Sequence, residues 1–152
     1  MEPAILKKQL LEACKRYVDS RIHTARESMQ YAQEAANEES KSSVGDKYET
    51  GRAIMQIERD KAAEQLDEAI KLKNTVDGIN LDASTEKVVL GSLIWTNTKN
   101  IFIAIGIGRL MLDEKEFLVV APTSPLGRTL MGKKVKDQLT FNNEVLTISQ
   151  IV

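Results

Sequence analysis

Two acidic residues stand three positions apart in a short polar segment, with charged, alanine-rich sequence on both sides. Asp46 and Glu49 lie within SSVGDKYETGR, residues 42–52. On the first turn of a helix, two exposed carboxylates at this spacing can share a hard cation such as Mg²⁺, which takes oxygen ligands and keeps several waters. Two carboxylates are an incomplete site, so a second macromolecule would have to supply the other ligands and a phosphate substrate.

The same spacing has a structural interpretation. The pattern D-x-x-E forms a capping box when the aspartate is the N-cap and the glutamate reaches back to it. Both acids would also favour the positive end of the helix that follows. From the spacing alone we favour this structural role for Asp46 and Glu49, and the cation site stays open as the alternative.

Other residue types that carry chemistry are scarce. Cys14 and His23 are the only cysteine and histidine, nine positions apart in one predicted helix. At that spacing they cannot form a nucleophile pair or share a metal ion, so we expect packing or surface roles for both. The segment GIGRLM, residues 106–111, lacks the third glycine and the following helix of a dinucleotide-binding loop. It therefore favours a strand.

The residues before position 78 must position the two acids, and their pattern predicts a pair of helices. Residues 4–40 contain no proline or glycine, and small or apolar residues recur there three or four apart, a narrow stripe typical of a helix that packs against one partner. The period resumes after residue 52. We expect an antiparallel hairpin over residues 1–77, with its tip near 42–51 and arms of about 40 to 50 Å. The stripe consists of Leu11, Cys14, Val18, Ile22, Ala25, Met29, Ala32 and Ala36, then Met55, Ala62, Leu66, Ala69 and Val76.

A second domain is predicted over residues 78–152, after a turn-rich boundary at 74–85. Short runs rich in Val, Ile and Phe, separated by turn-forming residues, predict an antiparallel sheet with strands within 86–95, 100–108, 116–122 and 138–152. One short helix is expected between them, with Ser124 as N-cap, Pro125 in the first turn and Gly132 just beyond the end. The fold class is therefore α+β.

Composition and charge exclude several functional classes. Hydrophobic residues make up 42% of the 152 residues and aromatic residues only 5%, which is thin for a single large core. The 21 basic and 22 acidic residues leave no basic excess for tracking phosphates. The N-terminal residues lack the apolar core of a signal peptide, and no run is long enough for a membrane span. With a single cysteine, these features predict a soluble cytoplasmic protein.

Segments of this sequence, taken together, resemble one family. GDKYE, residues 45–49, resembles the Gly-Asp-x-x-Glu tip motif of the bacterial Gre transcript cleavage factors. SPLGRTLMGKKVKDQLTF, residues 124–141, resembles that family's Ser-Pro-x-x-Arg/Lys-x-x-x-Gly-Lys segment with its following strand. VVLGSLI, residues 88–94, resembles the first strand of its C-terminal domain. The resemblance implies a coiled-coil hairpin followed by a small FKBP-like domain.

The resemblance also implies a transcription elongation factor, not an enzyme acting on its own. Gre-type factors dock their C-terminal domain at the rim of the secondary channel of RNA polymerase, and their hairpin enters the channel. Asp46 and Glu49 would then help to hold the second Mg²⁺ of the polymerase and stimulate cleavage of backtracked RNA. The isolated chain would bind no metal. By the same carry-over, the polymerase-binding residues would be Ser124, Pro125, Arg128, Gly132 and Lys133.

Two alternatives stay open. The family commonly has Leu-Ser between the two acids, where this chain has Lys47 and Tyr48. That departure motivates a secondary-channel regulator that modulates or inhibits the polymerase without promoting cleavage. A coiled-coil adaptor unrelated to transcription is the other alternative. We expect the cleavage factor, a monomer whose partners are core RNA polymerase and, indirectly, the 3′ end of backtracked RNA, with no binding to DNA or membranes.

Overall fold

The structure, a computed structural model, describes residues 2–40 and 45–152, except for the side chains of residues 39–49. The chain divides into two compact units. One comprises Tyr17–Lys73, and the other comprises Met1–Arg16 together with Asn74–Val152. The expected α+β class is confirmed, because a long helical hairpin precedes a six-stranded sheet.

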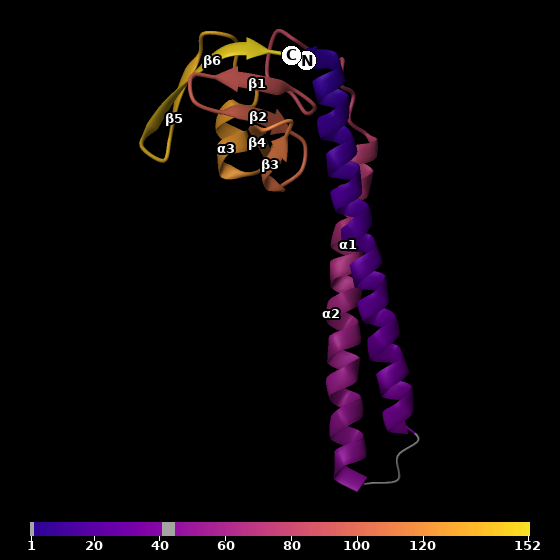
Figure 1. Cartoon of the computed structure of the whole chain (residues 1–152). Coiled ribbons are helices and arrows are strands. Elements are labelled where there is room, and N and C mark those ends of the chain that lie inside the picture. The colour runs from indigo at the N-terminus through magenta and orange to yellow at the C-terminus, as the bar shows by residue number, and fades with distance from the viewer. Residues whose placement is uncertain (1, 41–44) are drawn as a thin grey trace. The chain divides into compact units, whose positions relative to one another are not determined.

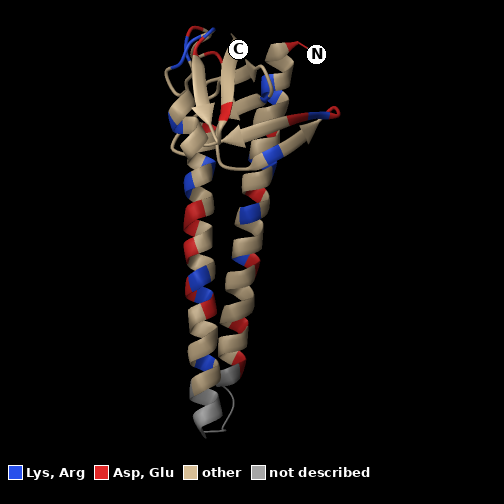
Figure 2. Cartoon of the chain, turned by 90° about the vertical axis from the view of Figure 1, so that its left-hand side faces the viewer, with Lys and Arg blue, Asp and Glu red and all other residues tan. Residues whose placement is uncertain are grey.

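The hairpin consists of α1 (Pro3–Ser40) and α2 (Gly45–Asp77), which run antiparallel (Figure 1). At 1.5 Å per residue, their 38 and 33 residues span about 57 and 50 Å. Basic and acidic residues are interspersed along both helices (Figure 2). The stripe predicted from the sequence forms the seam, with Leu11, Met29, Met55 and Leu66 only partly buried. Its buried members are Cys14, Val18, Ile22, Ala25, Ala32, Ala36, Ala62, Ala69 and Val76.

The sheet contains strands in the spatial order β3-β4-β2-β1-β6-β5. All neighbouring pairs are antiparallel except β2 and β4, which pair in parallel. The sequence predicted an antiparallel sheet, which is confirmed for every pair except this one. The reason is that β3 lies at the edge, so the chain returns as β4 between β3 and β2. The strands are β1 (Leu93–Thr96), β2 (Asn100–Ile103), β3 (Gly108–Leu112), β4 (Lys115–Val120), β5 (Gln138–Phe141) and β6 (Glu144–Ile151).

Two tight turns set the register of the hairpins at the sheet edges. Asp113 and Glu114 join β3 to β4 with φ values of 49° and 65°, and Asn142 and Asn143 join β5 to β6 with 49° and 64°. Two consecutive residues with positive φ form the type I′ turn, whose twist matches that of the flanking strands. Leu112 therefore pairs with Lys115.

The segment before β1 is not a strand, although its apolar residues favoured one. Here β1 begins only at Leu93. The backbone of Val88 instead exchanges hydrogen bonds with the segment after the short helix, donating to the carbonyl of Lys133 at 2.9 Å and accepting from the N–H of Gly132 at 2.9 Å. Residues 86–92 therefore tie the sheet to that segment without extending β1.

The short helix α3 (Pro125–Leu130) is capped as the sequence predicts. The hydroxyl of Ser124 accepts a hydrogen bond from the N–H of Gly127 at 3.0 Å, and Pro125 occupies the first turn. Gly132 follows the C-cap residue Met131 with a φ of 80°, the left-handed conformation that ends many helices. Leu126 and Leu130 of α3 pack into the core of the sheet with Ile94, Ile101, Ile103, Leu139, Leu146 and Ile148.

One glycine of α3 is required by a close approach of the backbone. A Cβ atom on Gly127 would lie 2.0 Å from the carbonyl oxygen of Ala121 and 2.9 Å from the hydroxyl of Ser124. The helix can therefore lie against the preceding segment only if this residue has no side chain.

Over the described helices, none has the length and apolar character needed to cross a membrane.

Candidate functional site

The two acids of the predicted metal site lie at the start of α2. This helix begins at Gly45, so Asp46 and Glu49 occupy backbone positions within its first turns, about one turn apart. The helix therefore starts one residue before Asp46, which differs from the capping box, where Asp46 would precede the helix. The side chains of both residues lie outside the described part of the structure, so their role in holding Mg²⁺ stays a prediction.

A hollow lies on the sheet of the C-terminal module, which we define as residues 78–152. It has a volume of about 890 Å³, in the range of pockets that bind ligands or partner side chains. Its apolar lining residues are Trp95, Leu118, Leu126 and Phe141. The strand register places Trp95 and Leu118 on opposite faces of the sheet. The polar and charged lining residues are Thr98, Lys99, Asn100, Arg109, Lys115, Glu116, Asn142, Glu144 and Gln150.

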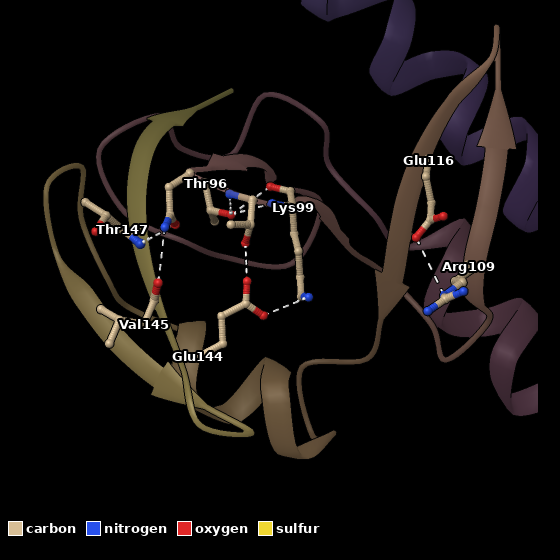
Figure 3. Close-up of polar contacts among 9 residues, drawn as sticks. Thr96, Lys99, Arg109, Glu116, Glu144, Val145 and Thr147 are labelled. Atoms are coloured by element: carbon tan, nitrogen blue, oxygen red, sulfur yellow. Dashed lines mark hydrogen bonds and ion pairs between the residues drawn. The ribbon is translucent and has the colours of Figure 1, made fainter.

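One side of this hollow is a closed polar network between β6 and the turn after β1 (Figure 3). Glu144 accepts a hydrogen bond of 2.6 Å from Thr98 Oγ1 and forms a 3.0 Å ion pair with Lys99 Nζ. The hydrogen bond from Thr98, followed by that from Lys99, lowers the pKa of the Glu144 carboxyl below its ordinary value. Both oxygens of Glu144 are therefore engaged within the chain.

The backbone under this network is held by an asparagine. The side chain of Asn97 donates to the carbonyl of Val145 at 3.2 Å and accepts from the N–H of Thr147 at 2.9 Å. The backbone N–H of Asn97 donates to the carbonyl of Thr147 at 3.2 Å. Asn97 thus replaces strand pairing beyond the irregularity between Trp95 and Thr96, and it fixes the turn that presents Thr98 and Lys99.

The opposite side of the hollow is formed by β3 and β4 and is loosely paired. Arg109 Nε lies 3.6 Å from Glu116 Oε1, and the two side chains are 81% and 56% exposed. Figure 3 shows this pair apart from Lys99, which lies in the turn after β1, and from Glu144 on β6. Lys115 also lines the hollow and is exposed. Exposed pairs of this kind contribute little to stability because water and salt screen them.

An aromatic contact lies on the face of the sheet opposite to Leu118. Trp95 lies 6.1 Å from Phe117, centroid to centroid, with the rings tilted by 54°. Phe117 is completely buried, whereas Trp95 is partly exposed and lines the hollow. Tilted aromatic pairs at this separation are favourable. The indole of Trp95 is therefore held in place by the core beneath it.

The five residues predicted to bind the polymerase are not gathered in this hollow. The hydroxyl of Ser124 donates to the carbonyl of Ala121 at 2.7 Å while it caps α3, so it has a structural role whatever else it binds. Gly132 ends the helix. Pro125 and Arg128 are exposed, and Lys133 is partly buried. Their role in binding a partner stays a prediction.

The sequence analysis missed the hollow because its residues come from separate segments. Lys99, Arg109 and Glu144 are brought together only by the strand order. The one available signal was Trp95, the only tryptophan. A large aromatic residue beside a turn can mark such a surface, but it does not predict which residues lie next to it.

A second feature that the sequence did not reveal is a buried lysine. The side chain of Lys7 is only 5% exposed and donates a hydrogen bond to the carbonyl of Leu81. Burial lowers the pKa of the Lys7 ammonium, and the nearby Asp82 opposes that change. The first turns of α1 are thereby tied to the segment that follows α2.

No group of three or more potential metal ligands occurs among the residues that the structure describes. No protein-family model matches the sequence, and no curated protein matches it significantly.

Proposed function

We propose that this chain is a transcription elongation factor that enters the secondary channel of RNA polymerase and stimulates cleavage of backtracked RNA. The observation that carries the proposal is the position of Asp46 and Glu49 at the start of α2, where the hairpin turns. About 36 Å of helix separates Glu49 from Lys73 at the far end of the hairpin unit. Such an arm delivers two carboxylates deep into a narrow channel.

The donor set fits the group that the proposal requires. Two carboxylates about one helical turn apart are hard oxygen ligands of the kind that Mg²⁺ takes, and the ion's remaining positions suit water and phosphate oxygens. When bound, the ion would polarise the scissile phosphodiester and stabilise charge on its oxygens. Asp46 and Glu49 would hold and orient the ion, whereas the polymerase would supply its own ligands and the RNA. The factor would therefore stimulate an activity of the polymerase, without catalysing a reaction alone.

The C-terminal module would bind the polymerase and keep the hairpin in the channel. The SPLGR segment supports this role, because it forms the capped helix α3 and leaves Pro125 and Arg128 exposed. The same proposal includes an FKBP-like fold for the module. The factor would act as a monomer in the cytoplasm, with core polymerase as its direct partner.

The second candidate function is a regulator that enters the same channel without promoting cleavage. The observation that favours it is the pair Lys47-Tyr48 between the two acids, which places a cation beside the carboxylates in sequence. An ammonium there would compete with the metal ion for the acids. Such a regulator would slow nucleotide addition and release no 3′ RNA fragment.

The test is RNA cleavage in a stalled, backtracked polymerase complex with Mg²⁺. We expect wild type to release a 3′ fragment and Asp46→Asn/Glu49→Gln to release none, although it still binds. Asp60→Asn/Glu64→Gln is the matched control, because it makes the same changes at exposed positions of α2 and should cleave like wild type. Equal cleavage by the tip variant would contradict the metal role. Binding without cleavage by wild type would favour the regulator.

A further inference from the structure

The edge strand β3 turns part of its backbone away from the sheet. It lies at one end of the strand order and pairs only with β4. A two-residue turn joins the two strands, so Leu112 and Lys115, which flank it, form a hydrogen-bonded pair, and every second residue of β3 repeats that pattern. Leu110 therefore directs its N–H and C=O towards β4, whereas Arg109 and Met111 direct theirs outwards.

The other side of β4 agrees with this alternation. There β4 pairs in parallel with β2, and the carbonyl of Val120 accepts a hydrogen bond from the N–H of Ala104 at 2.9 Å. Because backbone groups alternate along a strand, Val120 and Leu118 bond to β2, and Phe117, the partner of Leu110, bonds to β3. Among the described residues, no further backbone hydrogen bond reaches the two outward residues of β3.

The side chains of β3 add apolar surface to this edge. Met111 is 61% exposed, and Leu110 is only partly buried. At the opposite edge of the sheet, the exposed residues of β5 are the polar Gln138 and Thr140, while Leu139 is buried. A strand edge with free backbone groups and exposed apolar side chains is a template for another strand. Of the two edges, that of β3 is therefore the one suited to a partner strand.

We propose that β3 pairs antiparallel with β3 of a second copy of this chain, about a two-fold axis at Leu110. In this register Arg109 exchanges hydrogen bonds with the partner's Met111, and Met111 does so with the partner's Arg109, so the outward groups of both residues are engaged. The two six-stranded sheets become continuous. The inference goes beyond the proposed function and does not rest on it, because the monomer, in equilibrium with this dimer, stays the species that would enter the channel.

The apolar side chains of the edge are complementary to themselves in this register. The two copies of Leu110 meet at the axis as a non-hydrogen-bonded pair, with Cα atoms about 4.5 Å apart, and cover surface that one copy leaves partly exposed. The partner's Leu112 lies opposite Gly108. A Cβ atom on Gly108 would meet nothing within 4 Å, so there is room for the leucine.

The charged side chains on the other face of the edge are also complementary. Arg109 contacts Glu116 of the neighbouring strand only loosely, at 3.6 Å, with 81% and 56% of the two side chains exposed (Figure 3). In the dimer, the partner's Arg109 lies opposite Met111, whose neighbour on β4 is Glu116. The aliphatic part of that arginine can pack on the methionine, and its guanidinium comes within reach of a second carboxylate.

The test is sedimentation velocity of the full-length chain over a range of concentrations. The interface is smaller than that of a stable complex, so the range extends to about 500 µM, over which the average mass of wild type should rise from one chain towards two. We expect Met111→Lys to raise the dimer Kd at least about tenfold, because its ammonium would face the partner's Arg109. Val145→Lys is the control, with the same change at a 52% exposed residue of β6, and should dimerise like wild type.

A charge exchange tests the register. In Arg109→Glu/Met111→Lys, each introduced carboxylate would face an introduced ammonium of the partner subunit, so the Kd should return to within about threefold of wild type. Urea unfolding should give Met111→Lys the midpoint of wild type, because residue 111 is exposed and its backbone does not bond to β4. A lost dimer in this variant is then a loss of the interface, not of the fold.

Cross-linking gives a second readout of the same register. Leu110→Cys should form a disulfide-linked dimer with oxidised glutathione, because residues 110 of the two copies face each other at a distance that a disulfide spans. Leu112→Cys is the control and should stay unlinked, since residue 112 faces Gly108 of the partner subunit. The native Cys14 is buried and does not interfere.

Three results would overturn the inference: wild type that stays a single chain up to the highest concentration, Met111→Lys that dimerises as well as wild type, or a charge exchange that does not restore the dimer. Each leaves the proposed function in place, because RNA cleavage is measured separately. Conversely, wild type that dimerises as expected but neither binds polymerase nor cleaves would contradict the proposed function and leave this interface standing.

Discussion

Thr98 and Glu144 are 46 residues apart in the sequence, yet Thr98 Oγ1 donates to Glu144 Oε1 at 2.6 Å. The contact joins the turn after β1 to the first residue of β6. A short hydrogen bond to a carboxylate is stronger than one between neutral groups, and the ammonium of Lys99 reinforces it. The ionised form of Glu144 is therefore the form that the fold favours.

This relationship predicts a pH-dependent contribution of Glu144 to stability. Because hydrogen bonds from Thr98 and then Lys99 lower its pKa in the folded state, the contribution is present above the ordinary pKa of a glutamate and is lost as the pH falls through the folded value. We expect Glu144→Gln to be less stable than wild type at pH 7 and to converge with it in acid. Urea unfolding between pH 2.5 and about 7 measures the difference. Glu114→Gln, the same substitution in an exposed turn, is the control, and a constant difference across the series would contradict the prediction.

Lys7 gives a prediction of opposite sign. Burial lowers its pKa, so the charged form is disfavoured in the folded state, and its cost is present at neutral pH and relieved as the pH rises from the lowered value towards 10.5. We expect Lys7→Met to equal or exceed wild type in unfolding free energy at pH 7, since a buried charge is often replaced by an apolar residue without loss. The advantage should shrink by about pH 10. Lys8→Met, at an exposed neighbouring position, is the control. If the difference in unfolding free energy between Lys7→Met and wild type grew with pH, the predicted direction would be wrong.

Gly127 predicts a large steric effect from one methyl group. Its Cβ atom would lie 2.0 Å from the carbonyl oxygen of Ala121, a backbone atom that cannot turn away as a side chain can. We expect Gly127→Ala to lower the unfolding free energy by about 1–3 kcal/mol or more, as overpacking does. The matched control is Gly106→Ala, whose Cβ atom would meet nothing within 4 Å and should change stability by less than about 0.5 kcal/mol. Equal denaturant midpoints for the two variants would show that α3 can move away at little cost.

The tip variant should separate folding from function. The variant removes two negative charges from the first turns of α2, which costs about 0.3 to 1 kcal/mol per charge, so Asp46→Asn/Glu49→Gln should keep the helical content of wild type by circular dichroism. The seam of α1 and α2 is built from other residues, including Cys14, Val18 and Ala69. A large loss of helicity would assign the two acids a structural role. Asp60→Asn/Glu64→Gln again provides the comparison.

The sequence was most informative where a local rule determines the structure. The three-and-four spacing of Val18, Ile22 and Ala25 predicted the seam of the hairpin, because a helix repeats every 3.6 residues. Ser124 and Gly132 marked the ends of α3 because each cap needs a particular side chain or backbone angle. These features depend on residues within one helical turn of each other.

What the sequence did not predict depends on pairing between distant segments. The apolar run before Leu93 has strand composition, but its backbone found partners at Gly132 and Lys133 instead of extending β1. The parallel pairing of β2 with β4 follows from placing β3 at the edge, which no local pattern encodes. The hollow depends on that same strand order, so its lining residues could not be predicted from the sequence.

The buried position of Cys14 in the seam has a practical consequence. The residue is fully buried, and burial raises the pKa of its thiol to about 11. At neutral pH the thiol therefore stays protonated and shielded, and it reacts poorly with maleimide or iodoacetamide reagents. A cysteine introduced at the exposed Thr50 would then be the one site that such a dye labels, without removing the native cysteine. The natural chain is thus a ready background for attaching a fluorophore beside the tip and timing its entry into a partner.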